Sequence, residues 1–209
     1  MWLVGAPDVV GAVLVAGLVV FMVGAVAWRL EYERPLADSL PLIHHDRRRR
    51  AWIHLWMIPA LFLTPAGLAG FTALLDSPIE EVAALMAAVV YAIGSVCFIV
   101  SLAFRLTVVP WAAEHTTAAG SPPDAFGPFN SWASALYVIY MSSAYAAFAA
   151  LGVAVLASAD LPRWLGWLGV AWGVGFLAGF VATRFAGIFN PPFWAHAYTG
   201  VLGVVLLVS

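Results

Sequence analysis

The sequence predicts an all-α polytopic membrane protein with six transmembrane helices and with both termini outside. Three observations predict this fold. Hydrophobic residues make up 64% of the 209 residues and charged residues only 10%, a composition that a soluble domain of this length cannot bury. The apolar residues gather in six runs, each close to the ~20 residues that span a bilayer as a helix. Nearly every positive charge lies between these runs on one side.

The six runs are separated by short polar segments and together form one domain. None of them alternates apolar and polar residues as a barrel strand does, so each is expected to be a helix that satisfies its own backbone hydrogen bonds. In chain order, the predicted spans cover residues 8–29, 52–75, 82–106, 131–157, 164–183 and 193–209.

The first span is expected to remain in the protein as an anchor helix. Ala25-Val26-Ala27 has the small-x-small form of a signal-peptide cleavage site. However, no positive residue precedes the span, and Arg29 follows it directly. This order is atypical of a cleaved signal peptide.

The later spans carry signs of helix packing. Pro59 and Pro65 interrupt the second, and local adjustment of a membrane helix can accommodate them. The fourth carries serine and tyrosine hydroxyls, which are expected to bond neighbouring helices. The fifth has small residues a turn apart at Gly169–Gly173 and Gly175–Gly179, which allow close contact within the chain or in a dimer. The sixth is the shortest, which indicates either a helix that ends at the far interface or a truncated chain.

Arginine counting predicts the orientation. All nine basic residues are arginines, and eight of them fall in three loops that share a side: Arg29, Arg34, Arg47, Arg48, Arg49, Arg50, Arg105 and Arg184. Only Arg163 lies in an opposite loop. Such an excess marks cytoplasmic loops, and the absence of lysine is typical of high-GC bacterial coding. The expected location is therefore the bacterial inner (plasma) membrane.

Tryptophans support the same boundaries, because indole rings prefer the membrane–water interface. Only Trp172 falls well inside a predicted span. Three others lie near the outer ends (Trp2, Trp164 and Trp167) and six near the cytoplasmic ends: Trp28, Trp52, Trp56, Trp111, Trp132 and Trp194.

The run of four arginines, Arg47, Arg48, Arg49 and Arg50, is the strongest charge feature of the chain. It could contact anionic lipid headgroups, at ~1 kcal/mol for each arginine near a charged leaflet. The favoured interpretation is a topology determinant that holds the second helix in register. The two roles are compatible.

The histidines provide candidate ligand positions. His54 and His196 enter the second and sixth spans from the cytoplasmic side, the sixth helix being expected to begin at Pro191 with Asn190 as its cap. If those helices are neighbours, the two imidazoles could flank one cavity, closed by His115 or Glu114. Such a site could hold a metal, a haem or a polar ligand head. No metal-motif spacing accompanies these histidines, and interfacial hydrogen bonding is the favoured role.

Arg105 is a candidate buried charge. It shares one face of the third span with Gly94, Phe98 and Ser101, so it could point into the bundle. The favoured alternative is that its side chain reaches water at the helix end, since burial at mid-membrane costs ~2.5–3.5 kcal/mol. Glu114 and Asp124 in the following loop are its possible partners.

Two motifs carry a resemblance to a known family. Leu161–Gly169 reads LPRWLGWLG, and Asn190–Phe193 reads NPPF before the last span. These motifs resemble a family of uncharacterised bacterial integral membrane proteins, frequent in actinobacteria and described only as a domain of unknown function. The resemblance covers about residues 130–209. It implies six helices and no known activity, so it assigns no functional residues.

Three functional classes follow from these features. No nucleophile–base pair, phosphate loop or paired intramembrane carboxylates are found, which disfavours an enzyme. We expect a non-catalytic accessory subunit or a membrane component that binds lipid or a small molecule. The alternatives are a histidine-liganded metal or haem protein and a small transporter. The expected partners are membrane lipids, another membrane subunit or a second copy of the chain, and no nucleic acid.

Overall fold

The computed structural model describes residues 5–209, and Trp2 lies outside the described residues. Within this range the chain is all-helical, as predicted, with seven α-helices and two short 3₁₀ helices. Five helices are long and apolar enough to cross a membrane: α1 (Ala6–Ala25), α3 (Arg47–Thr72), α4 (Pro78–Ala119), α5 (Phe126–Ala157) and α6 (Arg163–Ala182). The last helix, α7 (Trp194–Val208), is apolar but has 15 residues. A sixth crossing therefore remains a prediction.

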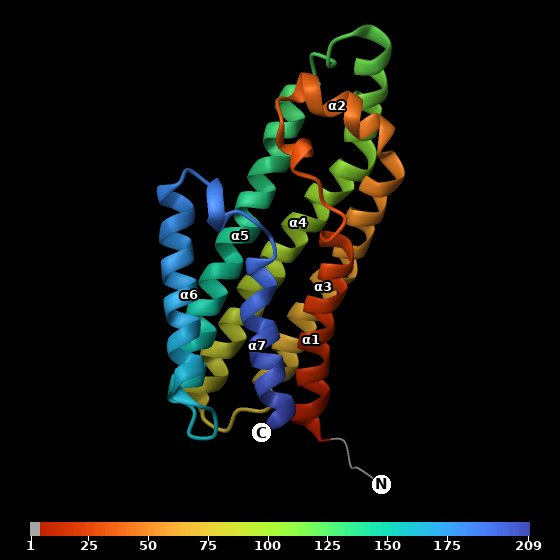
Figure 1. Cartoon of the computed structure of the whole chain (residues 1–209). Coiled ribbons are helices and arrows are strands. Elements are labelled where there is room, and N and C mark those ends of the chain that lie inside the picture. The colour runs from red at the N-terminus through yellow and green to blue at the C-terminus, as the bar shows by residue number, and fades with distance from the viewer. Residues whose placement is uncertain (1–4) are drawn as a thin grey trace.

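The helices form one bundle in which chain neighbours mostly pack together (Figure 1). α1 packs on α3, α3 on α4, α4 on α5 and α5 on α6, while α7 packs mainly on α1. The start of α1 and the end of α7 lie at the bottom of Figure 1. We call this the terminal end of the bundle, and the opposite end, where α2 lies, the arginine-rich end. The side of the membrane that each end faces remains a prediction.

The segment between the first two long helices is folded. It contains a 3₁₀ helix, η1 (Leu30–Glu33), and a short helix, α2 (Leu36–His45), which packs on α4. Asp46 accepts hydrogen bonds from the Tyr32 hydroxyl at 2.9 Å and from Arg29 at 2.8 Å. Burial, followed by this bond to Asp46, raises the pKa of Tyr32. These contacts fix the chain between α1 and α3 against the arginine-rich end.

Helix α4 runs far beyond its predicted end at residue 106. Its 42 residues make a rod of ~63 Å, about twice the thickness of a hydrocarbon core. The Ser77 side chain caps its start by accepting a bond from the backbone of Glu80. Its last turn ends at Gly120, whose φ of 79° is favourable only for glycine. The segment from 107 to 119, expected to be a loop, is therefore helical, because the end of an apolar run is not the end of a helix.

The chain between α6 and α7 turns back into the bundle. It includes the 3₁₀ helix η2 (Gly187–Phe189) and descends from the top of α6 to the start of α7, which lies partway down the bundle (Figure 1). The hydroxyls of Tyr145 and Tyr137 on α5 donate to the carbonyls of Phe189 and Asn190. The predicted helix start at Pro191 with an Asn190 cap is wrong. Helix α7 begins at Trp194 after Phe193, because tertiary contacts hold the preceding turn.

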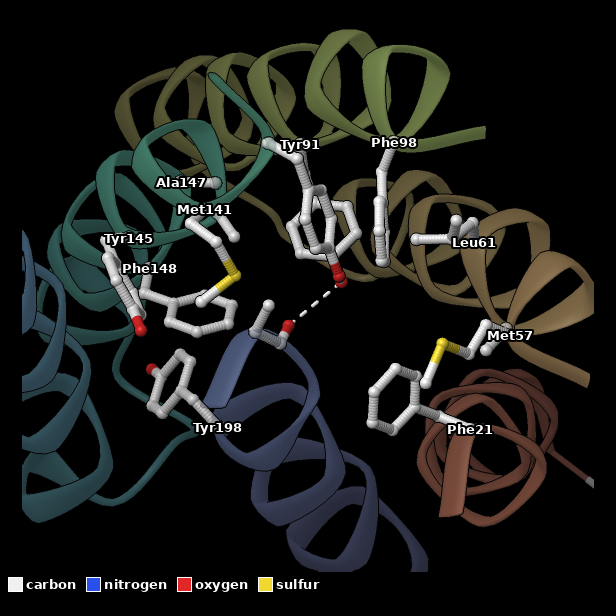
Figure 2. Close-up of a cluster of buried hydrophobic side chains, with 14 of the residues drawn as sticks. Phe21, Met57, Leu61, Tyr91, Phe98, Met141, Tyr145, Ala147, Phe148 and Tyr198 are labelled. Carbon is white, nitrogen blue, oxygen red and sulfur yellow. Dashed lines mark hydrogen bonds between the residues drawn. The ribbon is translucent and has the colours of Figure 1, made fainter. Parts of the chain in front are cut away.

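Both the interior of the bundle and its outer surface are largely apolar. Figure 2 shows Phe21, Met57, Leu61 and Phe98 converging from α1, α3 and α4 in the interior. The outward face of α4 exposes a row of aliphatic side chains suited to lipid: Val82, Leu85, Met86, Val89, Ile93 and Val96. This distribution is typical of a membrane protein.

Of the two small-residue pairs of the fifth predicted span, Gly169 and Gly173 lie against the backbone of α5, whereas Gly179 packs on the ring of Phe189. A Cβ on Gly173 would lie 2.4 Å from the backbone nitrogen of Ala149 on α5, and one on Gly169 would lie 2.9 Å from Gly152. The backbones of α5 and α6 are therefore in direct contact. Gly175, in contrast, has nothing within 4 Å of such a Cβ.

Candidate functional site

His196 lies in the middle of a buried polar network. Its side chain has 0% exposure, and it belongs to the first turn of α7. Its Nδ1 lies 3.0 Å from the hydroxyl of Thr64 on α3, and its Nε2 lies 3.1 Å from the hydroxyl of Tyr140 on α5. The ring also packs on Phe21 of α1, with centroids 4.5 Å apart. The imidazole thus contacts α1, α3 and α5 in addition to its own helix.

Tyr91 of α4 completes this network. Its hydroxyl donates to the carbonyl of Ala195 at 2.9 Å, the bond drawn in Figure 2. The same oxygen lies 3.4 Å from His196 Nδ1 and 3.5 Å from the Tyr140 hydroxyl. Both ring nitrogens of His196 therefore have protein partners. These hydrogen bonds hold the start of α7 in the interior. They also satisfy the ring nitrogens of His196, which would be costly to bury unpaired.

His54 occupies a different place in the bundle. It lies about 15 Å from Thr64 along the axis of α3, toward the arginine-rich end, and its nearest aromatic neighbour is Trp28. Its side chain is 2% exposed, and its Nδ1 has no hydrogen-bond partner within residues 5–209. His54 and His196 therefore have separate surroundings.

His115 and Glu114 do not join either histidine. Both are exposed on the distal part of α4, about 15 Å beyond Arg105 along the helix, and His115 packs beside Trp111. Among the described residues, no three His, Cys, Asp or Glu side chains are grouped so as to hold a metal. The four residues of the predicted shared site are not brought together. The chain before α7 turns back and places His196 in the interior, whereas Glu114 and His115 are exposed on the distal part of α4.

The structure instead groups His54 with two arginines. Arg50, one turn earlier on α3, is 6% exposed, and its guanidinium carbon lies 4.8 Å from the ring of Tyr32 and 5.4 Å from that of Trp28. Arg105 of α4 is half-buried and lies within electrostatic range of both Arg50 and His54. We call Arg50, His54 and Arg105 the basic cluster.

The basic cluster has no paired carboxylate. Arg29 and Asp46 form the one ion pair within 4.0 Å among residues 5–209. Arg50 Nε has no hydrogen-bond partner in the same range. Two acids bond the rings that Arg50 contacts. Asp46 accepts from the Tyr32 hydroxyl but is already paired with Arg29, and Glu33 accepts a bond from the indole of Trp28 at 3.2 Å. Within residues 5–209, neither the buried Arg50 nor the half-buried Arg105 is paired with a carboxylate, which leaves an excess of positive charge at the cluster.

Polar groups of α5 and of the segment between α6 and α7 lie beside the basic cluster. Tyr137, whose hydroxyl donates to the carbonyl of Asn190, is within electrostatic range of Arg105. The side-chain Oδ1 of Asn190 is buried and has no partner among the described residues. The basic cluster thus lies where α1, α3, α4, α5 and the chain before α7 meet.

The four arginines of the run Arg47–Arg50 do not form a single patch. Arg49 donates through Nε to the carbonyl of Ala27 at 2.6 Å, and Arg50 points into the bundle. Arg47 and Arg48 are exposed. Successive helix residues point ~100° apart, so consecutive arginines necessarily divide between the interior and the surface.

The sequence predicted that tyrosine hydroxyls of the fourth span bond neighbouring helices, as Tyr140 does with His196. It did not identify Tyr91 or Thr64 as partners of His196, or the proximity of Arg50 to His54. A signal for the second was available: positions 50 and 54 are one helical turn apart and therefore share a face. No comparable signal connects Tyr91, Tyr140 and His196, because these residues come from three helices that are distant in the sequence.

Comparison with known proteins gives a family. The family model described as "Domain of unknown function (DUF4386)" matches residues 9–208, and the chain belongs to this family. This confirms the predicted resemblance to an uncharacterised family and extends it from about residues 130–209 to nearly the whole chain. No curated protein and no solved structure matches the chain.

Proposed function

We propose that this member of the DUF4386 family is a non-catalytic membrane protein that binds an anionic amphiphile at the basic cluster. The observation that carries the proposal is that the buried Arg50 and the half-buried Arg105 have no paired carboxylate in the described part of the chain. We further propose that the arginine-rich end is cytoplasmic, in a bacterial inner membrane.

Electrostatics supports an anion as the ligand. Burying a charge without a partner is costly, and proteins normally pair or neutralise such a group. A guanidinium is poorly suited to neutralisation, because it keeps its proton under all ordinary conditions. A bound carboxylate or phosphate would accept hydrogen bonds from both arginines and from His54, and charge-assisted bonds of this kind are among the strongest in proteins.

The residues that lie next to the basic cluster, toward the terminal end of the bundle, favour a ligand with an apolar part. Met57 and Leu61 continue the face of α3 that carries His54, and Phe98 continues the face of α4 that carries Arg105. These side chains are buried and face one another in Figure 2. A ligand with its anionic group at the arginines would meet apolar side chains on its membrane side. The chemistry therefore fits a phospholipid headgroup or a fatty-acid carboxylate.

The test is a thermal-shift titration of the purified protein in neutral detergent. A ligand at 100 times its Kd stabilises the folded state by ~2.7 kcal/mol, which for a chain of this length raises Tm by roughly 5–10 °C. Phosphatidylglycerol or oleate should produce this shift, and phosphatidylcholine should not. Inorganic phosphate serves as the probe for a soluble anion.

Variants connect the response to the site. Arg50→Gln and Arg105→Gln should each remove most of the shift, whereas the exposed Arg163→Gln at the terminal end should retain it. Retention of the full shift by Arg105→Gln would refute the proposal. A shift with inorganic phosphate alone would overturn the amphiphile and leave only an anion site.

A further inference from the structure

A second polar site lies outside the bundle interior. A crevice of about 370 Å³ opens between the end of α2, the first turn of α3 and the distal part of α4. Its polar lining consists of His44, Arg47, Glu114 and Trp111. None of the three residues of the basic cluster lines this crevice, and its charged residues Arg47 and Glu114 are exposed whereas Arg50 is buried.

We propose that this crevice binds the headgroup of a zwitterionic phospholipid with a primary ammonium, the phosphoethanolamine headgroup. Arg47 and His44 would hold the phosphate, and Glu114 would hold the ammonium. Arg47 and Glu114 are free to bind a ligand because they do not form an ion pair with each other. Within residues 5–209, the one ion pair joins Arg29 and Asp46. One cationic and one anionic side chain on the same crevice match a ligand that carries both charges.

Pro110 leaves a backbone acceptor free beside the crevice. A proline has no N–H, so it cannot donate to the carbonyl four residues earlier in a helix. That carbonyl belongs to Leu106, and both residues line the crevice together with Ala51. The Leu106 oxygen therefore lacks its usual helical bond. A primary ammonium has three N–H donors and could bond this oxygen and the Glu114 carboxylate together, whereas a trimethylammonium has none.

The position of the crevice is appropriate for a lipid headgroup. Ala51 immediately precedes Trp52, and Trp52 and Trp111 are both about half exposed (49% and 50%). Exposed tryptophans are typical of the headgroup region. A phospholipid could therefore place its headgroup in the crevice while its acyl chains stay in the bilayer beside α3 and α4.

Native mass spectrometry of the protein from mixed micelles tests the proposal. With phosphatidylethanolamine and phosphatidylcholine at equal concentration, the wild-type protein should retain the former about tenfold more. Glu114→Gln should abolish this preference, and Arg47→Gln should reduce the retention of both lipids. The exposed residues Arg48 and Glu81 supply the matched controls Arg48→Gln and Glu81→Gln, which should behave as the wild type.

Two further arms make the outcome decisive. Water-soluble phosphoethanolamine in excess should compete only weakly, since it lacks the acyl chains; full competition would identify a soluble ligand and overturn the lipid. Arg105→Gln should keep the preference for phosphatidylethanolamine even though it loses the response to anionic amphiphiles, so the two sites can fail independently. Equal retention of the two lipids by the wild type, or an unchanged preference in Glu114→Gln, would refute the proposal.

Discussion

The hydrogen bonds around His196 predict how much Tyr91 and Tyr140 contribute to stability. Tyr140→Phe removes the one partner of Nε2, at 3.1 Å, and leaves a ring nitrogen unpaired in the interior. Hydrogen bonds between membrane helices contribute ~0.6 kcal/mol on average, and a buried group left unpaired costs ~1–3 kcal/mol. We therefore expect a loss of about 1 kcal/mol for Tyr140→Phe. Tyr91→Phe should lose about 2 kcal/mol, since its hydroxyl lies within 3.5 Å of three polar atoms.

Reversible unfolding by dodecyl sulfate in mixed micelles, followed by tryptophan fluorescence, measures these free energies. A double-mutant cycle isolates the pair: in a His196→Phe background, Tyr140→Phe should cost less than about 0.5 kcal/mol, because no ring nitrogen then remains to be left unpaired. An equal cost of Tyr140→Phe in both backgrounds would refute the assigned bond. A smaller loss for Tyr91→Phe than for Tyr140→Phe would contradict the central place given to Tyr91.

Two other predictions concern topology and helix packing. In a protein with Cys97 replaced by serine, single cysteines at the exposed positions Ala37 and Ala159 should react with an impermeant maleimide from opposite faces of the membrane. In intact cells, only Ala159→Cys should be labelled. Labelling of Ala37→Cys in intact cells would reverse the predicted orientation. Gly173→Ala should destabilise the protein by about 2 kcal/mol or more, because its Cβ would overlap the α5 backbone at 2.4 Å. Gly175→Ala, with nothing within 4 Å, should be neutral or slightly stabilising, and equal losses for the two variants would exclude this packing as the cause.

The apolar runs predicted where the helices lie in the sequence more reliably than where each helix ends. A bilayer requires each spanning segment to satisfy its own backbone hydrogen bonds, so a run of about 20 apolar residues is nearly sufficient to predict a helix. The same criterion ended the third span at residue 106, although α4 continues to Ala119. Beyond the hydrocarbon core the helix is stabilised by packing against α2 and α5, which hydropathy does not register.

The candidate sites depended on contacts between distant parts of the chain. The sequence by itself determined an all-helical membrane protein, the concentration of arginines near one end, and the presence of ionisable residues where the spans begin. Only the tertiary structure decided that Arg50 turns inward beside His54 and Arg105, while His196 lies deeper with Tyr91 and Tyr140. The physical reason is that periodicity specifies which residues share a face of one helix, whereas the neighbour of that face is set by how the helices pack.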